Sequence, residues 1–496
     1  MAYHLLTGAT GLLGTYLLRD LFASGIRVAV LVRSNKLEAA RQRIEAIMTR
    51  WDRVEGRSLP RPVILEGDLS NERFNLDERS LHWVTENCDS IIQNAASVSY
   101  YGKRPHEDPW RTNIGGTQNA LEFCRHTGIR QYHHVSTAYV CGKREGRVYE
   151  GELDEGQELN TDYEKSKFEG EQLVSAARHI DPPTIYRAAI IIGDSRTGHT
   201  PTFHGFYVPL KLVHTMYKHI IVDDLQVGPL LEAIQIQGHE RKNLVPVDWI
   251  SRVMAHIILN PQHHGDTYHL APEHPVTTNV MRDSMVQAFA TYGDPSARTD
   301  HNEKNGWTFN PGEFVKYFRD QMSIYESYWK DDPIFDLTNT KRVAPHLPPP
   351  EIDQEMLLRL CKYAIESNFG WPRPAPVELE IDVNKILNQM FPSQDTPPSA
   401  QAVGLQVNGA GGGQWELVLD GNHAISVRPG ISPGCHHRFY LNSHTYKCLE
   451  NGELSVRETL ESAQTIFEGE ELPQSNLIEV LEQVICPGTN SVKTRE

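Results

Sequence analysis

The chain has 496 residues, which at about 100–200 residues per domain predicts two to four domains. Its 64 acidic and 48 basic residues leave a formal charge of −16, which argues against a nucleic acid partner. The composition, 39% hydrophobic and 23% charged, is that of a globular protein. No apolar run reaches the roughly 18 residues that a membrane span needs, so we expect no transmembrane segment.

The first residues carry no basic region followed by a long apolar one, so we expect a cytoplasmic protein without a secretory signal. The seven cysteines are an odd number and do not form the pattern of a disulfide framework. We expect reduced thiols that are mostly buried.

The N-terminal part alternates between strand and helix signals. A strand over 3–6, a glycine-rich turn over 7–14, a helix over 12–23 and a strand over 27–32 form a β-α-β unit. Further apolar runs, separated by segments long enough for helices, lie at 63–65, 90–93, 132–135 and 184–192. This alternation predicts an α/β fold with a doubly wound parallel sheet.

Three further segments follow along the chain. Amphipathic helical stretches with many aromatic residues predict a cap over the sheet at about 203–368, so that the first domain covers 1–369. A proline-rich, polar linker follows at 370–400, interrupted by a short helix at 381–390. Residues 401–490 predict a small α+β domain, with a hairpin over 415–427, a strand at 438–441 and helices at 445–451 and 477–484.

The turn between the first strand and helix has the pattern of a dinucleotide-binding loop. Gly8 permits the tight turn, Gly11 lets backbone amides approach a pyrophosphate, and Gly14 lets helix and strand pack closely. Arg33 follows the second strand, where an arginine suits a 2′-phosphate, so NADPH is favoured over NADH. Asp68 can accept a hydrogen bond from the adenine amino group at the end of the third strand.

A second pattern predicts the chemistry. Tyr163 and Lys167 stand four residues apart, on one face of a helix, so the ammonium can lower the pKa of the phenol from about 10. The phenol would then donate a proton to a carbonyl oxygen that receives hydride, while Thr137 holds that oxygen from the other side. Ser136 competes with Thr137 for this hydroxyl role.

These motifs carry a family resemblance over about residues 1–280. The segments that carry it are TGATGLLG (7–14), GDL (67–69), NAA (94–96), NIGGT (113–117), STAYVCG (136–142) and YEKSK (163–167). They resemble an extended short-chain dehydrogenase/reductase. LVRSNKLEAARQRI (31–44), GDSRTG (193–198) and LVPVDWI (244–250) are similar to its thioester reductase and fatty acyl-CoA reductase branch.

The resemblance implies a Rossmann-type sheet, NADPH as cofactor and a catalytic set of Thr137, Tyr163 and Lys167. The cofactor-binding residues that it implies are Thr7, Gly8, Thr10, Gly11, Leu12, Leu13, Gly14, Arg33, Asp68, Leu69, Asn94, Ala95, Ala96, Asn113, Tyr163, Lys167, Ala189 and Ile190. Asn113 would be an accessory or structural member. One departure is Arg187-Ala188-Ala189, where the family usually has a proline after the arginine.

The last hundred or so residues are similar to a sterol-carrier-protein-like lipid-binding domain, from VGLQVNG (403–409) to LIEVLEQVI (477–485). Such domains bind an acyl or sterol chain or serve in docking and dimerisation, so a lipid ligand and a homodimer both stay open. Cys435, His436 and His437 superficially suggest zinc ligands, but neighbours on a strand point to opposite faces. We therefore expect no metal site.

Together these patterns predict an NADPH-dependent reductase of an acyl thioester, carried by coenzyme A or a carrier protein, to aldehyde or alcohol. The alternative keeps the cofactor and the catalytic residues but acts on a ketone, sterol or other lipid as a carbonyl or alcohol oxidoreductase. An epimerase and a lipid-binding protein without catalysis are further alternatives.

Overall fold

The computed structural model describes residues 2–35, 38–56, 59–217, 237–293, 311–323, 328–371, 381–391, 401–408, 411–421, 423–432, 435, 437–461, 464–469 and 474–485. Among the sequence expectations, the linker stretches 372–380 and 392–400, His436 and Cys486 lie outside these residues. The other six cysteines are free and buried, as predicted. In the described part of the chain, no helix is long and apolar enough to cross a membrane.

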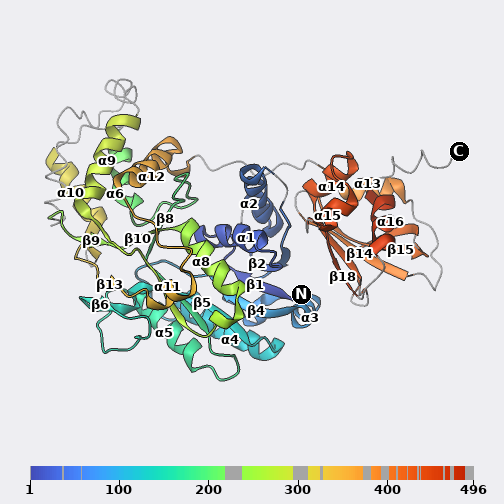
Figure 1. Ribbon diagram of the computed structural model, residues 1–496, viewed down its shortest axis with the longest axis horizontal. Coiled ribbons are helices and arrows are strands. Elements are labelled where there is room, and N and C mark those ends of the chain that lie inside the picture. The colour runs from blue at the N-terminus through green and yellow to red at the C-terminus, as the bar shows by residue number, and fades with distance from the viewer. Residues whose placement is uncertain are drawn as a thin grey trace.

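The centre of the molecule is a seven-stranded parallel sheet in the order β11-β7-β5-β4-β1-β2-β3, which confirms the α/β prediction (Figure 1). The strands are β1 Tyr3–Thr7, β2 Val28–Val32, β3 Val63–Glu66, β4 Cys88–Gln93, β5 Gln131–Thr137, β7 Thr184–Ala188 and β11 Thr267–Leu270. The order reverses between β1 and β4, so the carboxyl ends of these neighbours frame a crevice.

Helices cover both faces of the sheet and form one apolar core on each side. They are α1 Leu12–Ala23, α2 Ala40–Glu55 and α8 Val247–Leu259 on one face, and α3 Glu78–Asn87, α4 Gly116–Thr127 and α5 Asp162–Ala176 on the other. Leu17, Met48 and Ile257 on the first face and Val84, Phe123 and Val174 on the second are at most 1% exposed. Short helical turns join these elements: η1 Glu72–Asn75, η2 Arg111–Gly115, η3 Ala138–Cys141 and η4 Pro261–His263.

The cap is built from segments that leave the sheet and return to it. Its helices are α6 Tyr207–Tyr217, α9 Thr278–Tyr292, α10 Pro311–Met322 and α12 Gln354–Glu366, followed by the turn η7 Asn368–Gly370. Short strand pairs brace it: β8 Ile190–Ile192 with β10 Leu244–Pro246, β9 Arg241–Lys242 with β12 Val276–Thr277, and β6 Arg147–Val148 with β13 Ile334–Phe335.

The predicted cap at 203–368 is therefore not one continuous unit. Helix α8 packs beside α1, β11 is the edge strand of the large sheet, and α11 (Thr338–Val343) packs against β11. Residues 247–270 form α8 and β11. Their apolar periodicity would be the same in a cap as in the sheet domain, because the pairing of β11 with β7 is a long-range contact that no local pattern shows.

The C-terminal domain has a five-stranded sheet in the order β16-β15-β14-β17-β18, with helices packed on it. The elements are α13 Val383–Met390, β14 Gln401–Asn408, β15 Gly413–Asp420, β16 His423–Pro429, β17 Arg438–Asn442, α14 Ser443–Glu450, α15 Val456–Glu461, β18 Ile466–Glu468 and α16 Gln474–Ile485. The predicted hairpin is the antiparallel pair β15 and β16. Helix α13, which the sequence assigned to the linker, buries Val383 and Leu387 in the core of this domain.

The C-terminal domain packs on the sheet domain beside α2 and α3 (Figure 1). Trp83 of α3 donates its indole N–H to the Tyr440 hydroxyl at 3.2 Å, and both rings belong to the core formed by α3 and α4. Asn442 and Asn408 are buried and donate to the carbonyl oxygens of Leu59 and Pro62, at 3.4 and 3.2 Å. Buried, hydrogen-bonded amides across a contact indicate a specific interface.

Candidate active site

A cavity of about 740 Å³ opens at the carboxyl ends of the central strands and continues under the cap. The predicted site residues that line it are Thr7, Gly8, Thr10, Gly11, Leu12, Leu13, Arg33, Asp68, Leu69, Asn94, Ala95, Ala96, Thr137, Tyr163, Lys167, Ala189 and Ile190. The glycine-rich turn and the Tyr163 helix therefore meet in one cavity, although about 150 residues separate them along the chain.

The glycine-rich turn has the shape that a dinucleotide needs. Gly8 has a φ of +69°, and a Cβ there would lie 2.7 Å from the backbone of Ala95. The Thr7 hydroxyl accepts hydrogen bonds from the amides of Asn94 and Ala95, both at 3.1 Å, which holds the ends of β1 and β4 together. No side chain caps the first turn of α1, so its amides are available to a pyrophosphate. These residues fit an NAD(P) cofactor.

Gly14 has a packing role instead of a place on the cavity. A Cβ at this position would lie 2.1 Å from the Gly8 carbonyl oxygen, so any side chain would push α1 away from the turn. The prediction that Gly14 lets helix and strand pack closely agrees with this geometry, whereas its place among the cofactor-lining residues does not.

Two arginines stand at the far end of the turn. Arg33 pairs with Asp68, with 3.3 Å between its Nη1 and Oδ2. Arg43 of α2, which sequence reasoning did not single out, donates to the Arg33 carbonyl oxygen at 2.6 Å and to the Thr10 hydroxyl at 2.9 Å. Burial lowers the pKa of Arg43, and the charge of Arg33 adds to this effect. Two adjacent cations of this kind favour an anionic ligand group.

The Asp68 carboxylate pairs with Arg33, and its contact with an adenine stays a prediction. Burial acts to raise its pKa, but hydrogen bonds from Ser70 and the charge of Arg33 outweigh that effect, and the pKa of Asp68 is lowered. Its carboxylate accepts from the Ser70 amide at 2.9 Å.

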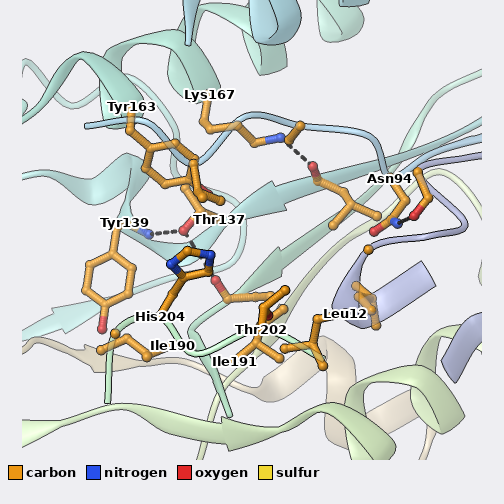
Figure 2. A pocket seen from close by; sticks show the side chains of 18 of the residues that line it. Leu12, Asn94, Thr137, Tyr139, Tyr163, Lys167, Ile190, Ile191, Thr202 and His204 are labelled. Atoms are coloured by element: carbon orange, nitrogen blue, oxygen red, sulfur yellow. Dashed lines mark hydrogen bonds between the residues drawn. The ribbon is translucent and has the colours of Figure 1, made fainter. Parts of the chain in front are cut away.

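Thr137, Tyr163 and Lys167 form a cluster on the opposite side of the cavity (Figure 2). Thr137 ends β5 and caps the turn η3; its hydroxyl donates to the Ala188 carbonyl oxygen and accepts from the Tyr139 amide, both at 3.3 Å. Tyr163 lies in the first turn of α5, which Thr161 caps with its hydroxyl. Lys167 follows one turn later on the same helix.

The pKa of Tyr163 moves in the direction opposite to the one predicted from the sequence. Burial raises the pKa of Tyr163 to about 12, and a hydrogen bond with Thr137 offsets only part of that rise. Lys167 does not lower it, because the ammonium turns to the Val135 carbonyl oxygen at 2.6 Å. Burial also lowers the pKa of Lys167 to about 8, against the charge of Glu171.

The environment of Ser136 favours Thr137 for the hydroxyl role. Ser136 donates to Glu171 at 2.7 Å, and this buried carboxylate is held by Arg187 at 2.5 Å. Arg187 is only 2% exposed and also donates to the Glu152 carbonyl oxygen at 2.6 Å. The departure from the family pattern at Arg187-Ala188-Ala189 therefore falls on a buried ion pair and on two residues that line the cavity.

Asn113, predicted as a cofactor-binding residue with an accessory or structural part, is hydrogen-bonded within the protein. Its amide accepts from the Ser97 amide at 2.8 Å and donates to the Ser97 carbonyl oxygen at 3.0 Å and to the Ser166 hydroxyl at 2.9 Å. All of these partners are protein groups, and Asn113 does not line the cavity. It fastens α5, the helix of Tyr163, to the segment after β4, which makes it the structural member that the resemblance allowed.

Sequence reasoning also missed the residues of the cap that close the cavity, among them His204, Phe206 and Met281. Figure 2 shows His204 on the cap side of Thr137, next to Ile190 and Ile191. The sequence contains only one sign that these residues line the cavity, which is their position in the aromatic and apolar stretch after residue 203. In the part of the chain that the structure describes, no three His, Cys, Asp or Glu residues gather as a metal site.

The sheet order, the glycine-rich turn and this cavity define a Rossmann-type NAD(P)-binding reductase fold. The chain belongs to the family described as Male sterility protein, whose model matches residues 6–254.

The chain matches parts of longer curated proteins. The chain is 29% identical over 285 residues to the nonribosomal peptide synthetase asaC of Aspergillus flavus, which covers 54% of this chain and 26% of that protein. It is 29% identical over 323 residues to the L-2-aminoadipate reductase large subunit of Penicillium chrysogenum, covering 60% of this chain and 21% of that protein. The chain thus spans about a quarter or less of the length of these relatives.

Solved structures of similar fold include the terminal R domain from the myxalamid PKS-NRPS biosynthetic pathway, with 24% identity and a TM-score of 0.57. The reductase domain of a nonribosomal peptide synthetase from Mycobacterium tuberculosis has 17% identity and a TM-score of 0.52. Each comparison covers 74% of this chain and 92% of that domain.

Proposed function

We propose that the protein uses NADPH to reduce an acyl thioester, carried on coenzyme A or on a carrier protein, to an aldehyde or further to the alcohol. The observation that carries this proposal is one cavity with the glycine-rich turn at one end and Thr137, Tyr163 and Lys167 at the other. The similarity to reductase domains of nonribosomal peptide synthetases supports a thioester as the substrate class.

The preference for NADPH over NADH rests on the pair of arginines. Arg33 and Arg43 bring two guanidinium groups to the end of β2, where the ribose 2′ position of a dinucleotide lies in this fold. A 2′-phosphate would receive charge-assisted hydrogen bonds from both, and Arg43 is already oriented by Thr10.

In the first step the thioester carbonyl receives a hydride at carbon and a proton at oxygen. NADPH, when bound, supplies the hydride for the thioester carbonyl carbon. With a pKa of about 12, the Tyr163 phenol keeps its proton at neutral pH and can give it to the carbonyl oxygen. Thr137 would turn its hydroxyl proton from the Ala188 carbonyl oxygen to the same substrate oxygen as negative charge develops there.

Lys167 has a supporting part in this scheme. Its ammonium donates to the Val135 carbonyl oxygen in this structure, and it would have to turn toward Tyr163, one turn away on the same face of α5, to add positive charge beside the phenolate that remains after proton transfer. The tetrahedral hemithioacetal then loses its C–S bond: the thiol leaves with the hydroxyl proton, and the aldehyde forms. No cysteine nucleophile takes part.

The proposed function is tested by following NADPH oxidation by absorbance with an acyl pantetheine thioester, an acyl-CoA and a free ketone. We expect consumption with the thioesters and a loss of at least about 100-fold in kcat for Tyr163→Phe, which removes only the hydroxyl. Consumption with the ketone alone would instead favour a carbonyl oxidoreductase. Equal rates in the variant would remove Tyr163 from the mechanism.

A further inference from the structure

The cavity continues beyond Thr137 and Tyr163 into the cap, and there its lining is mainly apolar, with His204, Lys242 and Arg282 among the exceptions. The apolar lining residues come from three cap segments. They are Phe206, just before α6, Met281 and Met285 of α9, and Phe318 and Met322 of α10. Phe206, Phe318 and Met322 are at most 6% exposed, so they belong to the packed interior of the cap. Thioether and phenyl groups of this kind accept apolar ligands of varied shape.

Aromatic rings connect this apolar region to the catalytic cluster. Tyr100 and Tyr328 lie with ring centroids 5.5 Å apart, and Tyr139 meets Tyr328 edge to face at 5.9 Å. All three residues line the cavity, and the Tyr100 carbonyl oxygen accepts from the amide of Asp162, the first residue of the Tyr163 helix. The group attached to a carbonyl at Tyr163 would therefore first meet these rings.

The hydroxyl groups of two of these tyrosines already have protein partners. Tyr139 donates to Asp332 at 2.7 Å, and the Tyr328 hydroxyl lies 3.2 Å from the Thr161 hydroxyl. A ligand therefore meets mainly ring carbon at these positions, which suits apolar or aromatic groups.

Charge on the cap side is neutralised by the chain itself. Lys242 is 7% exposed and donates to Asp332 at 3.1 Å and to the Tyr328 carbonyl oxygen at 2.6 Å. Arg282 donates to Asp283 at 2.7 Å. Among the described residues that line the cavity, the single carboxylate is Asp68, which pairs with Arg33 on the cofactor side.

From this charge pattern we propose that the acyl group is neutral and apolar, aliphatic or aromatic, without a carboxylate or ammonium group on the part that enters the cap. The inference rests on the proposed function and narrows its substrate class. A charged acyl group would lose its hydration beside methionine and phenylalanine side chains, and the cap-side cations Lys242 and Arg282 are already paired with Asp332 and Asp283.

The test compares thioesters of equal length on the same pantetheine arm: octanoyl, 7-carboxyheptanoyl and 8-aminooctanoyl. We expect the kcat/KM for octanoyl to exceed that of either charged chain by at least about 100-fold. Equal values, or a preference for a charged chain, would overturn the inference while leaving thioester reduction intact. If none of the three is reduced but a free ketone is, the proposed function fails and the inference falls with it.

A variant tests whether the lack of an unpaired cation among the described residues of the cap lining causes the preference for octanoyl over the carboxylated chain. Met285→Arg places a cation on the cavity side of α9, and we expect it to improve the ratio of 7-carboxyheptanoyl to octanoyl turnover by at least about 10-fold. The matched control is Val286→Arg on the same helix, where the side chain is 43% exposed and does not line the cavity. If Met285→Arg does not fold, Met281→Lys is the second variant. An unchanged ratio in a folded variant would contradict the assignment of the cap as the acyl site.

Discussion

Replacing Arg43 by alanine tests the assignment of the adenosine end of the cavity. Arg43 is fixed by its bonds to the Arg33 carbonyl oxygen and the Thr10 hydroxyl, so its guanidinium is oriented before a nucleotide binds. Removing it would cost one charge-assisted hydrogen bond to the 2′-phosphate, about 1.5–3 kcal/mol. That corresponds to an increase of about 10- to 150-fold in the Kd for NADPH.

The assay is a titration of the protein with NADPH and with NADH, followed by nucleotide fluorescence. NADH has no 2′-phosphate, so its Kd should change by less than about threefold. Arg53→Ala is the matched control, because Arg53 is exposed on the last part of the same helix, ten residues away. An equal loss of affinity for both nucleotides, or no loss for NADPH, would refute the reasoning.

Three further predictions follow from individual contacts. Because the pKa of Lys167 is about 8, kcat/KM should fall as the pH rises through 8, and Lys167→Arg should abolish that descending limb in a pH–rate profile. Thr137→Ala should lower kcat by about 100-fold or more, whereas Ser136→Ala, which removes one donor and leaves Glu171 only its bonds to Arg187, should lower Tm with a small effect on kcat. Trp83→Ala should cost about 3–5 kcal/mol and split a single calorimetric transition in two, because the indole joins the two domains through Tyr440.

Each of these three predictions has an outcome that would contradict it. A pH profile of Lys167→Arg with an unchanged descending limb would assign that limb to another group. A larger kcat loss in Ser136→Ala than in Thr137→Ala would exchange their roles. One unaltered transition in Trp83→Ala would show that the contact does not couple the domains.

Local patterns predicted the parts of the fold and candidate site that depend on near neighbours in sequence. The turn from Thr7 to Gly14 and the four-residue spacing of Tyr163 and Lys167 each follow from the geometry of a single loop or helix. The alternation of strands and helices predicted the parallel sheet for the same reason, because each β-α unit is a short segment.

What the sequence left unpredicted depends on contacts between distant residues. β11 joins the sheet by pairing with β7, about 80 residues away, and no local periodicity encodes that choice. Helix α13 has the same apolar spacing whether it lies in a linker or in a core. The shift in the pKa of Tyr163 was predicted in the wrong direction because burial, which dominates it, comes from the packed environment of α5.

The most direct test of thioester reduction is to follow the hydride itself. The protein is incubated with octanoyl pantetheine and NADPH deuterated at C4 of the nicotinamide, and the products are measured by mass spectrometry and a thiol assay. We expect one deuterium on the aldehyde carbon and one equivalent of free pantetheine for each NADPH consumed in the first reduction. Oxidation of NADPH without release of pantetheine, or an aldehyde without deuterium, would contradict thioester reduction.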